Sequence, residues 1–220
     1  MKKEEVLAKI HEVGIMPGIR TSSAEDGRFA AEAIANGGIP IVEITMTVPK
    51  AIDVISDMVR NAPNLIVGAG TVLDVETARR CVDAGVGFLT SPGLDLKVVE
   101  FALKENILII AGAMTPTEVI TAWKAGSELV KVFPCAPIGG PAYIKALRGP
   151  FPQVPMIAAG GVNQETAADF ILAGAAALGI GGRLIPRVAI EHRQPDRISE
   201  LARRFLRIVQ TARNKPSRRS

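Results

Sequence analysis

Short apolar segments rich in β-branched residues alternate with amphipathic segments of helical length from residue 15 onward. This alternation is typical of parallel strands joined by helices, because strands covered by helices are almost continuously hydrophobic. The apolar segments predict strands at residues 15–20, 39–45, 65–68, 87–90, 108–111, 129–133, 156–158 and 177–180. Eight strands of this kind are the number that closes into a barrel.

Helix start and stop signals fall between these segments. Thr115-Pro116-Thr117-Glu118 is a capping box with proline at the first helical position. Other side chains suited to cap a helix N-terminus are Ser23, Asp74 and Asn163. Glycines placed to end a helix in the left-handed conformation are Gly85, Gly126 and Gly174.

The sequence therefore predicts an α/β fold, a (β/α)8 TIM barrel over residues 1–213. A short N-terminal helix at residues 3–13 should cap the base of the barrel, and an amphipathic helix at residues 198–213 should close the fold. Residues 214–220 are expected to form a disordered basic tail. A doubly wound open sheet is the competing architecture, but the first strand is followed by Thr21-Ser22-Ser23 and not by G-x-G-x-x-G.

Composition narrows the function classes. No apolar run approaches the roughly 20 residues that span a bilayer, and the start Met1-Lys2-Lys3-Glu4-Glu5 does not resemble a signal peptide. We therefore expect a cytoplasmic protein with no membrane partner. The net charge is +4, of which three charges come from the tail, and only 4% of residues are aromatic, so nucleic-acid binding is disfavoured.

Two ionisable residues interrupt otherwise apolar strands. Glu43 lies in Ile41-Val42-Glu43-Ile44-Thr45, and Lys131 lies in Leu129-Val130-Lys131-Val132-Phe133. Each could lie at a strand edge and form a structural ion pair, but such residues are rarely buried without a purpose. If both face the barrel interior, burial favours the neutral amine, which attacks a ketone, while the carboxylate transfers protons. The imine then stabilises the products of carbon–carbon cleavage without any metal or cofactor.

Metal-dependent chemistry has little support. The two histidines, His11 and His192, lie in the leading helix and a late loop, and no strand end carries a cluster of metal-binding side chains. Cys135 has no histidine placed to activate it. The two cysteines, Cys81 and Cys135, are expected to be reduced thiols.

Glycine pairs follow the last two strands, at Gly160-Gly161 and Gly181-Gly182. Loops after strands seven and eight of such barrels commonly bind phosphate through backbone N–H groups, although glycine pairs also form tight turns. Arg183 and Arg20 are candidate cations at the same rim, or alternatively partners in surface ion pairs.

Together these residues resemble the class I family of 2-keto-3-deoxy-6-phosphogluconate (KDPG) and 4-hydroxy-2-oxoglutarate (KHG) aldolases. The similarity extends from about residue 7 to residue 213. Its strongest segments are Val42-Glu43-Ile44-Thr45, Thr47-Val48-Pro49, Gly68-Ala69-Gly70-Thr71-Val72, Ser91-Pro92-Gly93, Lys131-Val132-Phe133-Pro134, Gly149-Pro150-Phe151-Pro152 and Gly160-Gly161-Val162.

The resemblance implies a role for each site residue. Lys131 would form the Schiff base with the keto acid, and Glu43 would be the general acid and base. At the pyruvate end, Thr71 would hold the carboxylate, and Pro92 and Phe133 would shape the pocket. The residues that would bind the phosphate are Gly160, Gly161, Gly181 and Gly182. The family also implies a homotrimer and a lyase of the Entner-Doudoroff type.

The chain departs from the usual family pattern at three positions. Thr47 stands where many members carry arginine, and the resemblance implies that Arg20 supplies this charge instead. Ala159 replaces a threonine, and Arg183 replaces a serine. The resemblance therefore implies KDPG as substrate, with KHG or the galactonate epimer as alternatives. A phosphosugar isomerase or epimerase and a non-catalytic phosphosugar-binding barrel are the other classes left open.

Overall fold

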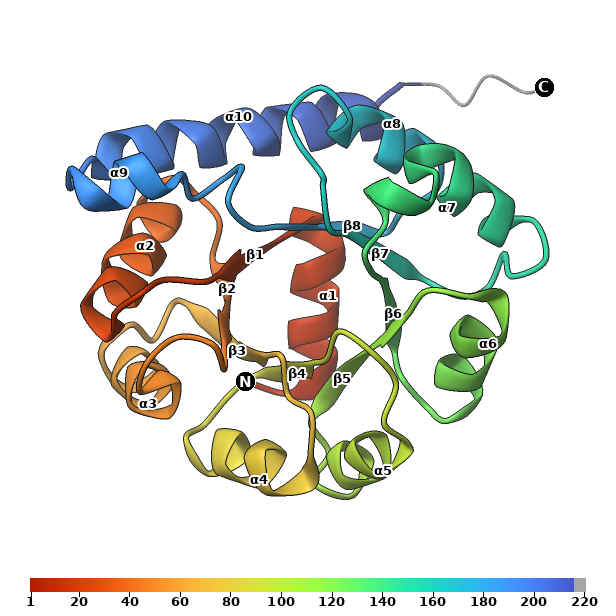
Figure 1. Cartoon of the computed structure of the whole chain (residues 1–220), viewed down its shortest axis with the longest axis horizontal. Helices are drawn as coiled ribbons and strands as arrows, with labels where there is room; N and C mark the ends of the chain where they lie inside the picture. The colour runs from red at the N-terminus through yellow and green to blue at the C-terminus, as the bar shows by residue number, and fades with distance from the viewer. Residues whose placement is uncertain (216–220) are drawn as a thin grey trace.

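The computed structural model describes residues 1–215 and contains one closed barrel of parallel strands. The strands follow one another around the ring in chain order, from β1 to β8, and β8 pairs with β1 (Figure 1). Their bounds are β1 Ile15–Ile19, β2 Ile41–Thr45, β3 Ile66–Gly70, β4 Phe88–Thr90, β5 Leu108–Ala113, β6 Leu129–Val132, β7 Met156–Ala159 and β8 Ala177–Ile180. The predicted (β/α)8 barrel is confirmed.

Helices surround the ring on all sides (Figure 1). Their bounds are α1 Lys3–Val13, α2 Ala24–Asn36, α3 Ala51–Asn61, α4 Val75–Asp83, α5 Leu96–Lys104, α6 Pro116–Lys124, α7 Gly140–Arg148, α8 Ala167–Leu172, α9 Arg187–Glu191 and α10 Pro195–Arg213. A 3-10 turn at Ala136–Ile138 precedes α7. Asn214 and Lys215, the first residues of the predicted tail, still donate backbone hydrogen bonds to the end of α10, and residues 216–220 lie outside the described part of the chain.

Most of the predicted helix caps are present. Thr115 and Glu118 form a reciprocal capping box at α6, and the side chains of Ser23 and Asp74 cap α2 and α4. The prediction for Asn163 was wrong. Its side chain accepts a 2.9 Å hydrogen bond from the Thr166 N–H, which forms a turn, and α8 begins only at Ala167. A short polar side chain stabilises such a turn as readily as a helix start.

Several element boundaries also differ from the prediction. The closing helix α10 begins at Pro195, three residues earlier than predicted, because proline is favoured at the first helical position. The strand β3 extends to Gly70 and β5 to Ala113. Both extensions consist of glycine and alanine, whose weak strand preference hides them in the sequence.

The base of the barrel is filled by large apolar side chains that meet α1. Val6 and Ile10 of α1 pack against the first inward side chains of the strands, including Ile41, Phe88 and Leu129. The predicted capping helix is therefore confirmed, and it lies across the central opening of the ring in Figure 1. No helix among residues 1–215 is long and apolar enough to cross a membrane.

The end of α10 is hydrogen-bonded to the base of the barrel. The guanidinium of Arg213 donates to the carbonyl oxygens of Glu12 at 2.7 Å and Ala176 at 2.8 Å. These two bonds tie the last helix to the end of α1 and to the segment just before β8. The base is thus closed by packing and hydrogen bonds, which leaves the carboxyl ends of the strands for a site.

Candidate active site

Glu43 and Lys131 point into the barrel from strands β2 and β6. Ile41 and Leu129, two positions earlier on the same strands, belong to the apolar interior beneath α1. Because side chains two apart on a strand face the same side, Glu43 and Lys131 occupy the next layer toward the carboxyl ends. This is the end at which (β/α)8 barrels build their active sites.

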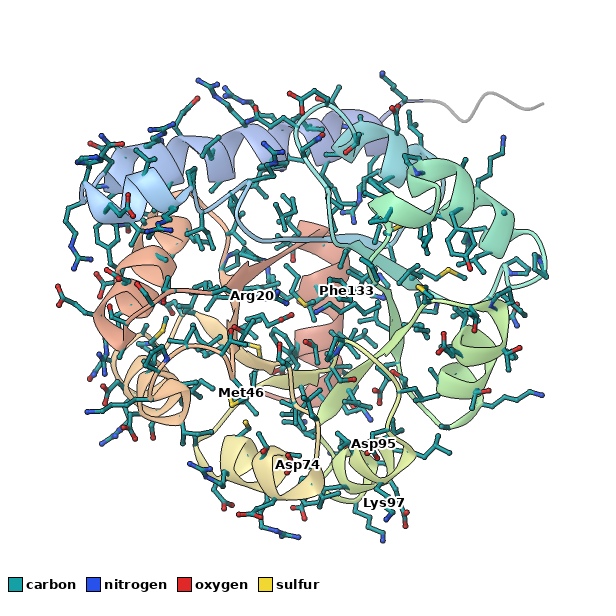
Figure 2. All side chains as sticks on the ribbon, viewed as in Figure 1. Arg20, Met46, Asp74, Asp95, Lys97 and Phe133 are labelled. Carbon is teal, nitrogen blue, oxygen red and sulfur yellow. The ribbon has the colours of Figure 1, made fainter. Side chains whose placement is uncertain are left out.

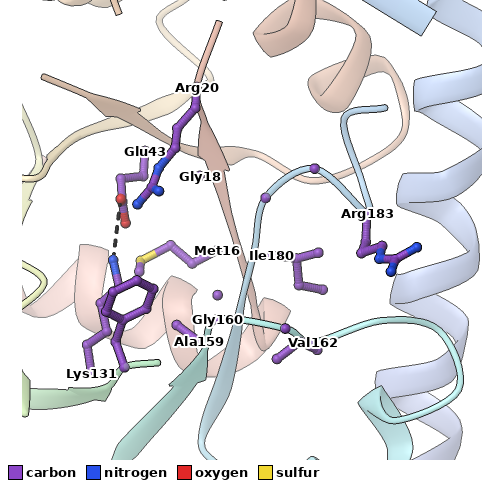
Figure 3. Close-up of a pocket in the computed structure, with 15 residues that line it drawn as sticks. Met16, Gly18, Arg20, Glu43, Lys131, Ala159, Gly160, Val162, Ile180 and Arg183 are labelled. Carbon is purple, nitrogen blue, oxygen red and sulfur yellow. Dashed lines mark ion pairs between the residues drawn. The ribbon is translucent and has the colours of Figure 1, made fainter. Parts of the chain in front are cut away.

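The amine and the carboxylate face each other. Lys131 Nζ lies 3.5 Å from Glu43 Oε1 (Figure 3). Lys131 is 6% exposed and Glu43 is 3% exposed. Mutual pairing is what allows two charges to be buried together. The separation exceeds the length of about 2.8 Å that is usual for a charge-assisted hydrogen bond, so the carboxylate is held loosely.

The Lys131 amine has an aromatic ring as its second neighbour. Nζ lies 5.8 Å from the centre of the Phe133 ring, near the limit of a cation–π contact. A proton passed from the ammonium to Glu43 would leave two neutral groups, one of which is a nucleophile.

Gly70 makes room for the Glu43 carboxylate. A methyl group at this position would come within 2.0 Å of Glu43 Oε1 and 2.5 Å of Glu43 Cδ. Non-bonded carbon atoms usually keep about 3.5 Å from their neighbours. The carboxylate therefore occupies the volume that a side chain at position 70 would need. Sequence reasoning did not identify this glycine. Its signal was the spacing of Gly68 and Gly70, which places both on the inner face of one strand.

A cavity of about 200 Å³ opens above the pair. It is lined by Met16, Gly18, Arg20, Glu43, Lys131, Phe133, Ala159, Gly160, Gly161, Val162, Gly179, Ile180, Gly181, Gly182 and Arg183. The cavity therefore unites the predicted nucleophile, the predicted acid and base, both glycine pairs and both arginines. Figure 2 shows Arg20 and Phe133 over the central ring, whereas Asp74 and Asp95 lie over the outer helices.

The two arginines point in different directions. Figure 3 shows the side chain of Arg20 reaching from the end of β1 toward the Glu43–Lys131 pair. Arg183 follows β8 and points away from the pair, toward α10. Of the two, Arg20 is placed to meet a negative group close to the amine, and Arg183 leaves the cavity open.

Thr71 and Pro92 lie outside the residues that line this cavity. They follow β3 and β4, across the ring from β7 and β8. Thr71 adopts a left-handed backbone with φ 61°, which is uncommon for a β-branched residue and occurs most often at functional sites. The backbone of Pro92 packs closely over β5, because a methyl group at Gly112 would lie 2.2 Å from its carbonyl carbon.

The two glycine pairs differ physically. Gly160 and Gly161 have φ values of 85° and 92°, and a methyl group at Gly161 would lie 2.4 Å from Ala136 Cβ. The first pair is therefore required by the turn and its packing. Gly182 has open space within 4 Å. Within residues 1–215, no hydrogen bond uses the N–H groups of Gly161, Gly182 or Arg183, so these donors remain available to an anion.

Two residues that differ from the usual family pattern, Thr47 and Ala159, have clear surroundings in the structure. The Thr45 hydroxyl donates to the Ile19 carbonyl at 2.9 Å and lies 2.6 Å from the Thr47 hydroxyl. Thr47 is thus engaged with Thr45 and brings no charge to the rim. Ala159 lines the cavity with a methyl group, at the position where the resemblance leads us to expect threonine.

The cysteines and histidines are remote from this chemistry. Burial raises the pKa of the Cys135 thiol to about 11 and that of the Cys81 thiol to about 12, so both remain protonated. His11 lies on α1 at the base, where partial burial and then the charge of Arg213 lower its pKa. Among the described residues, no group of three or more potential metal ligands comes together.

Comparison with known proteins identifies the family. The family model described as KDPG and KHG aldolase matches residues 6–201. The chain belongs to the KDPG and KHG aldolase family. The match includes every strand of the barrel and each residue of the cavity described above.

Members of this family from several bacteria are similar over most of their length. The 2-dehydro-3-deoxy-phosphogluconate aldolase of Pseudomonas aeruginosa is 32% identical over 196 residues, covering 89% of each chain. The KHG/KDPG aldolase of Escherichia coli K12 is 34% identical over 190 residues, covering 86% of this chain and 89% of the relative.

Solved structures of family members share the fold. The KDPG aldolase of Legionella pneumophila, with pyruvate captured as a covalent carbinolamine, matches with a TM-score of 0.83 and 31% identity. That match covers 89% of this chain and 95% of the other. The sequence resemblance to the KDPG and KHG aldolases is thereby confirmed.

Proposed function

We propose that this chain is a class I aldolase that cleaves KDPG into pyruvate and glyceraldehyde 3-phosphate, with Lys131 as the Schiff-base nucleophile. The observation that carries the proposal is the buried amine of Lys131, 3.5 Å from the Glu43 carboxylate beneath an open cavity. Membership of the KDPG and KHG aldolase family supports the same reaction class.

The reaction begins at the amine. Neutral Lys131 attacks the C2 ketone, and Glu43 supplies the proton that lets the carbinolamine oxygen leave as water. The product is a protonated imine. Its positive nitrogen withdraws electrons from the bond between C3 and C4 when Glu43 takes the proton of the C4 hydroxyl. The bond breaks, an aldehyde forms at C4, and the electron pair remains as the enamine of pyruvate.

The second half returns the enzyme to its starting state. A proton from Glu43 adds to the enamine carbon and regenerates the imine, which water hydrolyses to pyruvate and free Lys131. Both halves need the same carboxylate in two protonation states. A loosely held Glu43, buried beside the amine, is suited to this exchange.

The proposal extends to the residues that contact the substrate. We assign the pyruvate carboxylate to the Thr71 side of the barrel, with Arg20 as its cation and with Pro92 and Phe133 as pocket walls. The phosphate is assigned to the opposite side, where Gly160, Gly161, Gly181 and Gly182 present backbone N–H groups. Arg183 adds positive charge beyond them.

The test is reductive trapping. Borohydride with saturating pyruvate should add a permanent mass to Lys131, located by peptide mapping, and Lys131→Met should acquire none. An unmodified Lys131 in folded protein would remove the mechanism. It would favour a phosphosugar isomerase, an epimerase or a non-catalytic binding barrel, none of which needs this amine.

The choice of aldehyde half is tested by kinetics. Relatives named for both KHG and KDPG make the phosphate-free keto acid the alternative substrate. Inorganic phosphate should inhibit KDPG cleavage competitively because it would occupy the glycine loops. Absence of inhibition, together with faster turnover of KHG, would assign the shorter substrate. The galactonate epimer is distinguished by the same steady-state comparison. The homotrimer and the cytoplasmic location remain predictions, the first testable by analytical ultracentrifugation.

A further inference from the structure

Thr90 carries a buried hydroxyl without a partner. It ends strand β4 and is 0% exposed, and within residues 1–215 its Oγ1 makes no hydrogen bond. The backbone is fixed on both sides, since Thr90 pairs with Ile110 and its carbonyl accepts from the Val72 N–H at 3.1 Å. Buried hydroxyls are almost always satisfied, so this one indicates a partner that arises during function.

The hydroxyl lies on the inner face of the barrel at the level of Glu43. Phe88, two residues earlier, belongs to the apolar interior, so Thr90 faces the same side. The pairing of Gly68 with Phe88 continues along the strands to place Gly70 beside Thr90. The Glu43 carboxylate fills the volume over Gly70. Neighbouring strands lie about 4.8 Å apart, so Thr90 is one strand away from the volume over Gly70 into which the Glu43 carboxylate reaches.

Nearby hydroxyls have other partners. Thr45 donates to the Ile19 carbonyl, and Ser91 donates to the Gly93 carbonyl. Among the described residues, Thr90 therefore carries the buried hydroxyl that has no hydrogen-bond partner. The Glu43 carboxylate is also weakly bound, since Oε1 lies 3.5 Å from Lys131 Nζ.

We propose that Thr90 is a positioning residue for Glu43, whose hydroxyl binds the carboxyl group once Lys131 has formed the imine. The inference rests on the proposed function. An ammonium offers three N–H donors to the carboxylate, whereas a protonated imine offers one. The reaction thus removes donors from Glu43 at the moment when its position matters most. A hydroxyl donates to the carboxylate and accepts from the protonated acid, so Thr90 serves both states.

The step that depends on this contact is proton exchange at the pyruvate methyl carbon. In the imine of pyruvate, Glu43 removes a methyl proton, the C–H bond breaks, and an O–H bond forms on the carboxyl group. The C–H electron pair becomes the carbon–carbon double bond of the enamine, and the iminium electrons return to nitrogen. The reverse transfer, after exchange of the acid proton with D2O, places deuterium on the methyl group.

The experiment compares Thr90→Val with Thr90→Ser. Valine keeps the volume and removes the hydroxyl, and serine restores it. Deuterium uptake into pyruvate, followed by proton NMR, should fall about tenfold or more in the valine variant, which is the effect of losing one hydrogen bond to a charged group. The serine variant should remain within about threefold of the original rate. Trapping of pyruvate on Lys131 by borohydride should reach the same yield in all three proteins.

Stability gives an independent readout. Loss of an unpaired buried hydroxyl should raise the melting temperature of Thr90→Val by about 2–4 °C. Thr90→Ala, which cannot overfill the site, should show the same loss of exchange. Equal exchange rates in the wild type, the valine variant and the alanine variant would overturn the assignment of Thr90. Failure to trap pyruvate in the wild type would instead refute the imine mechanism, so the two failures are distinguishable.

Discussion

Gly70→Ala tests whether the position of the Glu43 carboxylate limits the reaction. The substitution adds one methyl group to the inner face of β3, at a point 2.0 Å from Glu43 Oε1, 2.5 Å from Cδ and 2.6 Å from Cγ. The backbone of Gly70 tolerates alanine, since its φ lies outside the left-handed range. The carboxylate must therefore yield, and not the strand.

The size of the displacement follows from these contacts. Carbon atoms and their neighbours settle at about 3.5 Å, so Oε1 must retreat by about 1.5 Å. A misplacement of about 1 Å can cost about 10²-fold in rate. We expect a fall in kcat of about 100-fold and a loss of about 1–3 kcal/mol in the free energy of unfolding from overpacking.

Steady-state kinetics on KDPG and chemical denaturation supply the two measurements. Gly27→Ala is the matched control. Gly27 lies in helix α2, and its added methyl group would lie at an ordinary 3.5 Å from Thr21 Oγ1 and Val48 Cγ1, none of which lines the cavity. It should leave kcat unchanged and stabilise the fold by about 0.5–1 kcal/mol, since glycine is unfavourable within a helix. A Gly70→Ala variant with wild-type kcat would show that the carboxylate position is not limiting, and would refute the reasoning.

Three further predictions concern the charged and sulfur groups. Lys131→Ala should lower kcat by about 10³-fold or more on KDPG, by analogy with other essential nucleophiles, and near-normal turnover would contradict its role. Cys81 and Cys135 should resist a thiol reagent at about pH 8 in folded protein, because burial keeps both thiols protonated; rapid labelling would show that they are accessible. The pKa of His11 is depressed in the folded state, so the unfolded chain binds the proton first as the pH falls through the ordinary value of 6.5. The contribution of neutral His11 to the free energy of unfolding should be fully present above pH 6.5 and decline below it. The melting temperature of His11→Gln should therefore fall less than that of the wild type between about pH 7.5 and pH 5.5.

The fold was predictable because the apolar strand segments and the helix-ending glycines both indicate the same alternation of strands and helices. Every strand segment is apolar enough to be buried on both faces, and glycines such as Gly85 and Gly126 end the helices with the positive φ that was expected. The errors fall where residues lack a distinctive preference. Gly70 and Ala113 extend strands without β-branched side chains, and Asn163 suits a turn and a helix cap equally well.

The site was predictable in part. Charged residues within apolar strands stand out, and Glu43 and Lys131 are found together as proposed from that contrast. Thr90 could not be found in this way, since threonine is common in strands and its significance lies in an unpaired hydroxyl. The differing directions of Arg20 and Arg183 likewise depend on loop geometry, which the pattern of apolar residues does not specify.

The barrel interior has two layers with different roles, one filled by large apolar side chains and one in which glycines leave open volume. At the base, Phe88 and Ile41 fill the space and meet α1, so packing there stabilises the fold. One layer higher, glycines leave volume that the Glu43 carboxylate and the Lys131 amine occupy. A step of two positions along one strand, as from Ile41 to Glu43, therefore leads from a stabilising side chain to a reactive one, because alternate side chains share a face. The closed ring holds this register, since a shift of one residue would turn both layers outward.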